Sequence, residues 1–290
     1  MISKLINALT LGRLKWGWYS LSSPTPDSPI VIGGCSRSGT TLLYAILNAH
    51  SRLFLGLETA LFAGNMDLPH ISRRTGMSLE KVKRLYQRSH CSAVFTKRIL
   101  TDLMVSAGKL HWGDKSPINM RVISGIFRRF PRAKFVHAIR DGRDVVCSLH
   151  THTPTFKKGV AHRDGTEVPW ETCIDRWCSR VHMGIGWRSD KRYYEVKYED
   201  LVLKPEETLK ALFGWLDEPW ESKILETSQL TKVDTHPEVS KPINNSAVGR
   251  WKEDLPVDVR GLFRGTAQGL LVLLGYADGP DWIESNGFEH

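Results

Sequence analysis

Residues 29–50 read PIVIGGCSRSGTTLLYAILNAH and contain three patterns in succession. The apolar, β-branched run at 29–34 predicts a buried strand. The glycine-bearing loop GCSRSGTT follows at 34–41, and the apolar residues of LLYAILNAH have helical spacing. A strand, a glycine loop and a helix in this order open many nucleotide-binding α/β folds.

The loop at 34–41 almost matches the phosphate-binding pattern G-x-x-x-x-G-K-[ST]. Its glycines let consecutive backbone N–H groups converge on a phosphate, and the following helix adds its positive N-terminal end. Thr40 stands where that pattern has the lysine that reaches the β- and γ-phosphates of a nucleoside triphosphate. We therefore expect the loop to hold a phosphate other than the γ-phosphate of ATP, with Arg37 as its cation. An ordinary glycine turn is the alternative interpretation.

Strands and helices alternate along the remaining chain. We expect strands at 52–56, 134–141 and 193–201, and helices over much of 60–110, at 143–150, at 204–217 and before Gly275. This alternation predicts an α/β protein, a single domain of P-loop type with a central parallel sheet flanked by helices. The Pro- and Ser-rich stretch at 22–29 divides a leader, residues 1–28, from that domain, residues 29–290.

The leader carries apolar residues at helical spacing, namely Ile2, Leu5, Ile6 and Leu9. It predicts a short amphipathic helix that packs on the domain or, alternatively, lies on a membrane surface. The chain has no run of 18 apolar residues, so no membrane-spanning helix is expected.

The chain has 40 Lys and Arg against 31 Asp and Glu, a net charge of +9, which indicates an anionic partner. Nucleic acid, a membrane surface and a phosphorylated small molecule all fit that charge. Its 41% hydrophobic and 24% charged residues exclude disorder, collagen and coiled coil as the main state. Residues 73–98 hold eight Lys and Arg against one Glu, a surplus without an assigned role. Five cysteines without a CxxC pattern predict reduced thiols and no metal site.

Six segments, in this order, resemble those of sulfotransferases that use 3′-phosphoadenosine 5′-phosphosulfate (PAPS). They are IGGCSRSGTTLL (32–43), LETALF (57–62), GDKSP (113–117), KFVHAIRDGRDVVCS (134–148), KYEDLVLKPEETL (197–209) and SKPINNSAVGRWKEDLP (240–256). The likeness is to tyrosylprotein sulfotransferases and their bacterial relatives. It implies PAPS as co-substrate and no metal.

The resemblance implies which residues would bind the cofactor. Those at the 5′-phosphosulfate would be Arg37, Ser38, Gly39, Thr40 and Thr41. Arg140 and Ser148 would recognise the 3′-phosphate, and Tyr198, Asn244 and Arg250 would make further contacts. The alternative for Arg140 is a surface ion pair with Asp141 or Asp144, and for Tyr198 a place in the core.

By the same resemblance, Glu58 would accept the proton of an acceptor hydroxyl, and Lys115 would stabilise the phosphate oxygen as the sulfuryl group departs. Their alternatives are a carboxylate at a helix start and an exposed lysine paired with Asp114.

The expected function is in-line sulfuryl transfer from PAPS to a hydroxyl of a saccharide, lipid-linked glycan or small molecule rather than of protein tyrosine. Trp170, Trp177 and Trp187 would stack on sugars or belong to the core. Two alternatives stay open: a P-loop kinase or nucleotidase that uses ATP, and a non-enzymatic binder of nucleic acid or membranes. We expect a bacterial cytoplasmic protein that contacts the inner face of a membrane, forms a homodimer and binds no nucleic acid.

Overall fold

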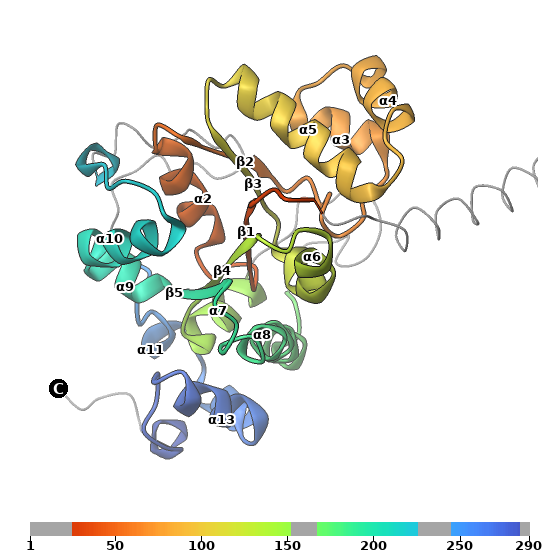
Figure 1. Ribbon diagram of the computed structural model, residues 1–290. Coiled ribbons are helices and arrows are strands. Elements are labelled where there is room, and N and C mark those ends of the chain that lie inside the picture. The colour runs from red at the N-terminus through yellow and green to blue at the C-terminus, as the bar shows by residue number, and fades with distance from the viewer. Residues whose placement is uncertain (1–24, 152–166, 226–244, 285–290) are drawn as a thin grey trace, which may run out of the picture. The chain divides into compact units, whose positions relative to one another are not determined.

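A computed structural model describes residues 25–151, 167–225 and 245–284. Its strands are β1 (Ile30–Gly34), β2 (Leu53–Leu57), β3 (His111–Lys115), β4 (Lys134–Ile139) and β5 (Tyr193–Lys197). They form one sheet in the order β2-β3-β1-β4-β5 (Figure 1). Strand β3 runs parallel to both β1 and β2, with Leu57 opposite Lys115. The predicted α/β fold, with a parallel sheet flanked by helices, is confirmed.

Helices occupy most of the chain between and after the strands. The α-helices are α2 (Thr40–Ala49), α3 (Leu68–Thr75), α4 (Leu79–Gln87), α5 (Ser92–Ser106), α6 (Ile123–Arg129), α7 (Gly142–His150), α8 (Trp170–Ile185), α9 (Tyr198–Leu203), α10 (Pro205–Leu216), α11 (Trp251–Asp254), α12 (Val257–Arg260) and α13 (Thr266–Leu273). The 3₁₀ helices are η1 (Pro117–Val122), η2 (Ser222–Leu225), η5 (Gly261–Phe263) and η6 (Asp281–Ile283). Within the described chain, no helix is both long enough and apolar enough to cross a bilayer.

The described residues divide into two compact units. The first contains residues 25–33 and 44–136. In it, α3, α4 and α5 lie together, and α5 packs against β2 and β3 (Figure 1). A Cβ atom at Gly56 of β2 would lie 2.9 Å from the Leu100 side chain of α5, so glycine allows close contact between strand and helix there. Phe130 packs edge-on against both Phe62 and Trp112 in the core of this unit.

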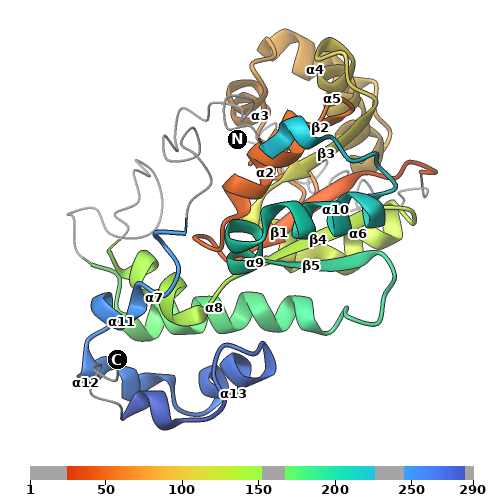
Figure 2. The ribbon, with the colours of Figure 1, turned by 90° about the vertical axis from the view of Figure 1, so that its left-hand side faces the viewer.

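The second unit contains residues 34–43, 137–151, 167–225 and 245–284. Helix α8 packs against α7 and α13 (Figure 2). Trp177 of α8 is fully buried, and its ring lies so close to Gly142 that a Cβ atom there would be 2.6 Å away. Trp177 is thus a core residue and is not available for stacking on a sugar. Trp170 is partly buried and stacks on His150, with ring centroids 3.6 Å apart.

One sequence expectation needs correction, and one strand was not predicted. The strand predicted at 193–201 ends at Lys197, and Tyr198 begins helix α9. Glu199 and Asp200 occupy the first turn of that helix, where acidic side chains stabilise a helix N-terminus. Strand β3 gave no apolar pattern, because its buried positions include Asp114 and Lys115. The predicted boundary between a leader and a domain at residues 28–29 stays a prediction.

Candidate functional site

Glu58 and Lys115 meet where β2 and β3 end. Parallel strands bring their carboxyl ends to the same edge of a sheet, and the backbone N–H of Glu58 donates to the Lys115 carbonyl at 2.7 Å. Lys115 Nζ donates to Glu58 Oε1 at 2.9 Å. The Lys115 side chain is fully buried, whereas the Glu58 side chain is 29% exposed. The two residues predicted to be catalytic therefore form one ion pair, with the carboxylate as its solvent-facing member.

Asp114 holds the turn that carries Glu58. It is fully buried and accepts hydrogen bonds from Thr59 Oγ1 at 2.7 Å, Ser116 Oγ at 2.8 Å and Asn119 Nδ2 at 3.3 Å. Glu58 itself has a φ of 52°, in the left-handed region that non-glycine residues rarely adopt. The hydrogen bonds to Asp114 fix this strained turn, and strain of this kind is common where a side chain must be aimed at a site.

The Asp114 carboxylate and the Lys115 ammonium beside this turn are both removed from water. Burial raises the pKa of Asp114, and its hydrogen bonds oppose that rise. Burial lowers the pKa of Lys115, while the nearby Glu58 carboxylate favours its charged form.

A second cation reaches the same carboxylate. Arg74, in the last turn of α3, places Nη2 3.4 Å from Glu58 Oε2. Helix α3 is fixed at both ends, because Asp67 caps its N-terminus and Gly76 ends it with a φ of 70°. Glu58 thus lies between a buried ammonium and a half-buried guanidinium.

The predicted phosphate loop belongs to the second unit. Arg37 and Gly39 have φ angles of 74° and 80°, and the N–H of Ser38 donates to the Cys35 carbonyl at 3.1 Å. A Cβ atom at Gly39 would lie 2.5 Å from the Tyr198 ring. Only glycine therefore fits between the loop and that ring. Ser38 and Thr40 are buried at the start of α2.

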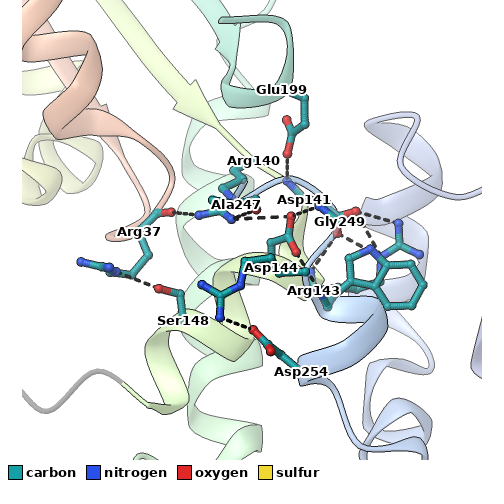
Figure 3. Close-up of polar contacts among 12 residues, drawn as sticks. Arg37, Arg140, Asp141, Arg143, Asp144, Ser148, Glu199, Ala247, Gly249 and Asp254 are labelled. Carbon is teal, nitrogen blue, oxygen red and sulfur yellow. Dashed lines mark hydrogen bonds and ion pairs between the residues drawn. The ribbon is translucent and has the colours of Figure 1, made fainter. Parts of the chain in front are cut away.

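Arg37, Arg140 and Ser148 converge beside this loop (Figure 3). Arg37 Nε donates to Ser148 Oγ at 2.9 Å, and Arg140 Nη1 donates to the Arg37 carbonyl at 3.1 Å. The Arg140 guanidinium lies 4.6 Å from the centre of the Tyr198 ring. Arg140 is 7% exposed, and its Nε is buried without a hydrogen-bond partner among the described residues. An unsatisfied buried donor of this kind is costly and suits a site that receives an acceptor.

Asp144 joins this cluster to the segment that follows residue 244. Its carboxylate accepts from the N–H groups of Gly249 at 2.9 Å and Trp251 at 2.8 Å, and lies 3.6 Å from Arg140 Nη2. Arg140 Nη2 also donates to the Ala247 carbonyl. The ion pair of Arg140 with Asp144, which was the alternative to a phosphate contact, therefore exists, but it is buried rather than at the surface.

One predicted cofactor residue is not part of this cluster. Arg250 points its side chain, 59% exposed, toward Asp254 one turn on and pairs with it at 2.8 Å. Asn244 lies outside the described residues. The sequence reasoning passed over Arg74, Asp114 and Asp144 as site residues. The neighbours of Lys115 and Arg140 in GDKSP and RDGRD were the available signal for the two aspartates, whereas nothing in the sequence marked Arg74 among eight basic residues.

A known protein family matches the part of the chain that contains Glu58, Lys115 and Arg140. The family described as "Sulfotransferase family" matches residues 29–222. The chain belongs to the sulfotransferase family. Protein-tyrosine sulfotransferase A of Caenorhabditis elegans is 30% identical over 83% of this sulfotransferase and 64% of its own length. Protein-tyrosine sulfotransferase 1 of Homo sapiens is 30% identical over 80% of this chain and 66% of its own length. The protein-tyrosine sulfotransferase of Drosophila melanogaster is 29% identical over 89% of this chain and 55% of its own length. The chain thus spans only part of these relatives.

Solved structures share the fold. The sulfotransferase domain from the curacin biosynthetic pathway has a TM-score of 0.62 at 21% identity and covers 88% of this chain and 99% of its own. Mouse sulfotransferase SULT7A1, solved in complex with PAP, has a TM-score of 0.50 at 12% identity over 93% and 92%. At these identities the likeness supports the sulfotransferase fold alone.

Proposed function

We propose that this chain transfers the sulfuryl group of PAPS to a hydroxyl acceptor. The observation that carries the proposal is the Lys115–Glu58 pair, a buried ammonium 2.9 Å from a partly exposed carboxylate in a chain of the sulfotransferase family. Such a pair offers both a cation for a leaving oxygen and a base for a hydroxyl.

The second unit offers a fitting set of groups for a phosphorylated nucleotide. Arg37 and Arg140 provide guanidinium groups, Ser148 provides a hydroxyl, and the Arg140 Nε is an unsatisfied donor. Thr40 in place of a lysine disfavours a nucleoside triphosphate. The mouse relative in complex with PAP, the desulfated product of PAPS, supports the same assignment. In this proposal Arg37 to Thr41 bind the 5′-phosphosulfate, while Arg140 and Ser148 bind the 3′-phosphate; Tyr198, Asn244 and Arg250 stay predicted contacts.

In the proposed step, Glu58 takes the proton of the acceptor hydroxyl as its oxygen bonds to sulfur. Lys115, in its charged form, offsets the negative charge on the phosphate oxygen from which sulfur departs. The bond from sulfur to the acceptor oxygen replaces the bond from sulfur to the phosphate oxygen. Asp114 acts through both residues, because it fixes the turn on which they lie.

A thermal-shift comparison separates this proposal from an ATP-dependent kinase or nucleotidase. We expect PAP to raise the melting temperature well beyond ATP, and Arg140→Ala to weaken PAP binding about 10- to 100-fold, as for a lost hydrogen bond to a charged group. Arg264→Ala is the matched control, because Arg264 is exposed and pairs with Glu284 in the same unit. Stronger stabilisation by ATP would favour the kinase.

A substitution of Arg74 gives a second test, which concerns Glu58 as the proposed base. We expect Arg74→Gln to move the acidic limb of the kcat/KM profile to higher pH, because a carboxylate that loses a neighbouring cation binds its proton more tightly. Arg74→Lys should restore the limb, since it keeps the charge. An unmoved limb in Arg74→Gln would mean that Arg74 does not act on the group that titrates.

The proposed acceptor is a hydroxyl of a saccharide, lipid-linked glycan or small molecule. A tyrosyl peptide is the competing acceptor, because the curated relatives are protein-tyrosine sulfotransferases. Labelled PAPS incubated with extract of the source cell should place label in the saccharide or lipid fraction, and label in protein tyrosine would support the alternative. The cytoplasmic location, the membrane contact and the homodimer stay predictions.

A further inference from the structure

A cavity of about 280 Å³ lies in the first unit, between residues 62–64 and the helical segment 121–129. Its polar lining comes from Arg121, Ser124, Arg128 and Arg129, and no aspartate or glutamate lines it. A cavity of this size holds a phosphate- or sulfate-sized group with room for part of the molecule that carries it.

Two neighbouring helical segments supply the exposed polar side chains of the cavity. Arg121 belongs to η1, whereas Ser124 and Arg128 are four residues apart in α6, a spacing that brings them to the same side of that helix. All three are exposed. The side chains of Arg121 and Arg128 make no hydrogen bond or ion pair in residues 25–151, 167–225 and 245–284. Two like charges on the lining of one cavity repel each other, and an anion between them would reverse that repulsion.

Arg129 places a third positive charge behind them. It is 6% exposed and donates to the carbonyls of Gly125 and Phe62 and, at 3.5 Å, to Ser92 Oγ. These three acceptors are neutral oxygens, and Arg129 also lines the cavity. The bond to Phe62 also fixes the far wall of the cavity.

Two lysines of this unit differ from this set. Lys81 of α4 pairs with Asp102 at 2.6 Å, and Lys97, which lines a groove along α5, pairs with Asp27 at 2.9 Å. Those cations are neutralised by neighbours on the same unit, whereas the cavity at α6 has arginines on its rim and no acid in its lining.

We propose that this cavity binds a phosphate or sulfate monoester group carried by a larger molecule. Arg121 and Arg128 present planar guanidinium forks that match the oxygens of such a group, and the Ser124 hydroxyl donates between them. No residue of the phosphate loop at 34–41 lines this cavity. The wall at 62–64 continues the loop that starts at Glu58, so its ligand contacts the chain four to six residues after that carboxylate.

Inorganic phosphate is the first probe, titrated by calorimetry into the full chain with PAP at saturation so that the phosphate loop is filled. A PAP titration comes first and tests the proposed function. Absence of PAP binding would contradict the proposed function, whereas absence of phosphate binding to the PAP complex would contradict only the site at α6. We expect the variant Arg121→Gln with Arg128→Gln to weaken phosphate binding at least tenfold. The control variant Arg73→Gln with Arg88→Gln removes the same charge from exposed positions of the same unit and should bind as the wild type does.

A third variant, Arg121→Lys with Arg128→Lys, keeps the charge and loses the guanidinium forks, so an intermediate loss is expected. An equal loss of phosphate affinity in the Arg121/Arg128 and Arg73/Arg88 glutamine variants would show that binding depends only on the overall charge, and it would overturn the site. No phosphate binding to the wild type up to about 50 mM, far weaker than ordinary millimolar affinities, would overturn it as well.

Vesicles distinguish the source of the group. Phosphatidylcholine vesicles with and without phosphatidic acid, whose headgroup is a phosphate monoester, are used in a flotation assay. Association that requires phosphatidic acid and is lost in the Arg121/Arg128 glutamine variant supports a lipid headgroup as ligand. Binding of phosphate without association to vesicles supports a soluble ligand.

Discussion

Glu58→Gln is expected to lower kcat about 10²- to 10⁴-fold, the range that general-base catalysis contributes. The amide keeps the size of the side chain and an oxygen that accepts from Lys115, but it does not take a proton at neutral pH. The affinity for PAP should change less than about twofold, because in the proposed step Glu58 acts on the acceptor hydroxyl and not on the cofactor. Steady-state kinetics and a PAP titration measure the two quantities.

Glu80→Gln is the matched control, since Glu80 is exposed in the first turn of α4 in the same unit. It should leave kcat and the affinity for PAP unchanged. A turnover of Glu58→Gln near that of the wild type would remove Glu58 from the role of base. A large loss of PAP affinity in the same variant would show that the carboxylate acts on the cofactor rather than on the acceptor.

The sequence predicted the parts of the site that local patterns describe. The strand, loop and helix from residue 29 have a strong local signature, because glycines and apolar spacing act over a few residues. Glu58 and Lys115 were predicted as catalytic from their positions in motifs. They are 57 residues apart in sequence, so their contact depends on the register of the sheet and could not be read from a local pattern. The contact follows once β2 and β3 are known to be parallel neighbours.

Long-range hydrogen bonds are the part that the sequence did not predict. Asp144 accepts from backbone groups 105 and 107 residues away, and no local pattern identifies such partners. Strand β3 was missed for a related reason: its charged residues are buried because Asp114 and Lys115 find partners in the turn after β2. A strand stabilised by polar contacts on its buried side gives no apolar alternation. Tyr198 was placed on a strand because YYEVKY alternates as strands do, yet it starts a helix.

Lys115→Met is expected to lower kcat about 10²- to 10³-fold, as removal of a group that stabilises developing charge does. Methionine fills nearly the same buried volume. Glu58 keeps its contact with Arg74 and its exposed face, so the carboxylate is not left isolated. The free energy of unfolding should therefore fall by less than the about 3–5 kcal/mol that removal of one partner of a fully buried ion pair costs. Chemical denaturation and steady-state kinetics measure the two effects, with Lys83→Met, an exposed lysine of α4, as control.

The pH dependence of kcat is a second measurement that tests the role of Lys115. Burial lowers the pKa of Lys115 from its ordinary value of 10.5. The proposed step needs the charged ammonium, so wild-type kcat should fall as the pH rises through that lowered pKa. In Lys115→Met this alkaline limb should be absent, and the residual rate should stay level there. A retained limb would assign it to another group, and wild-type turnover in the variant would show that Lys115 serves the fold and not the departure of the sulfuryl group.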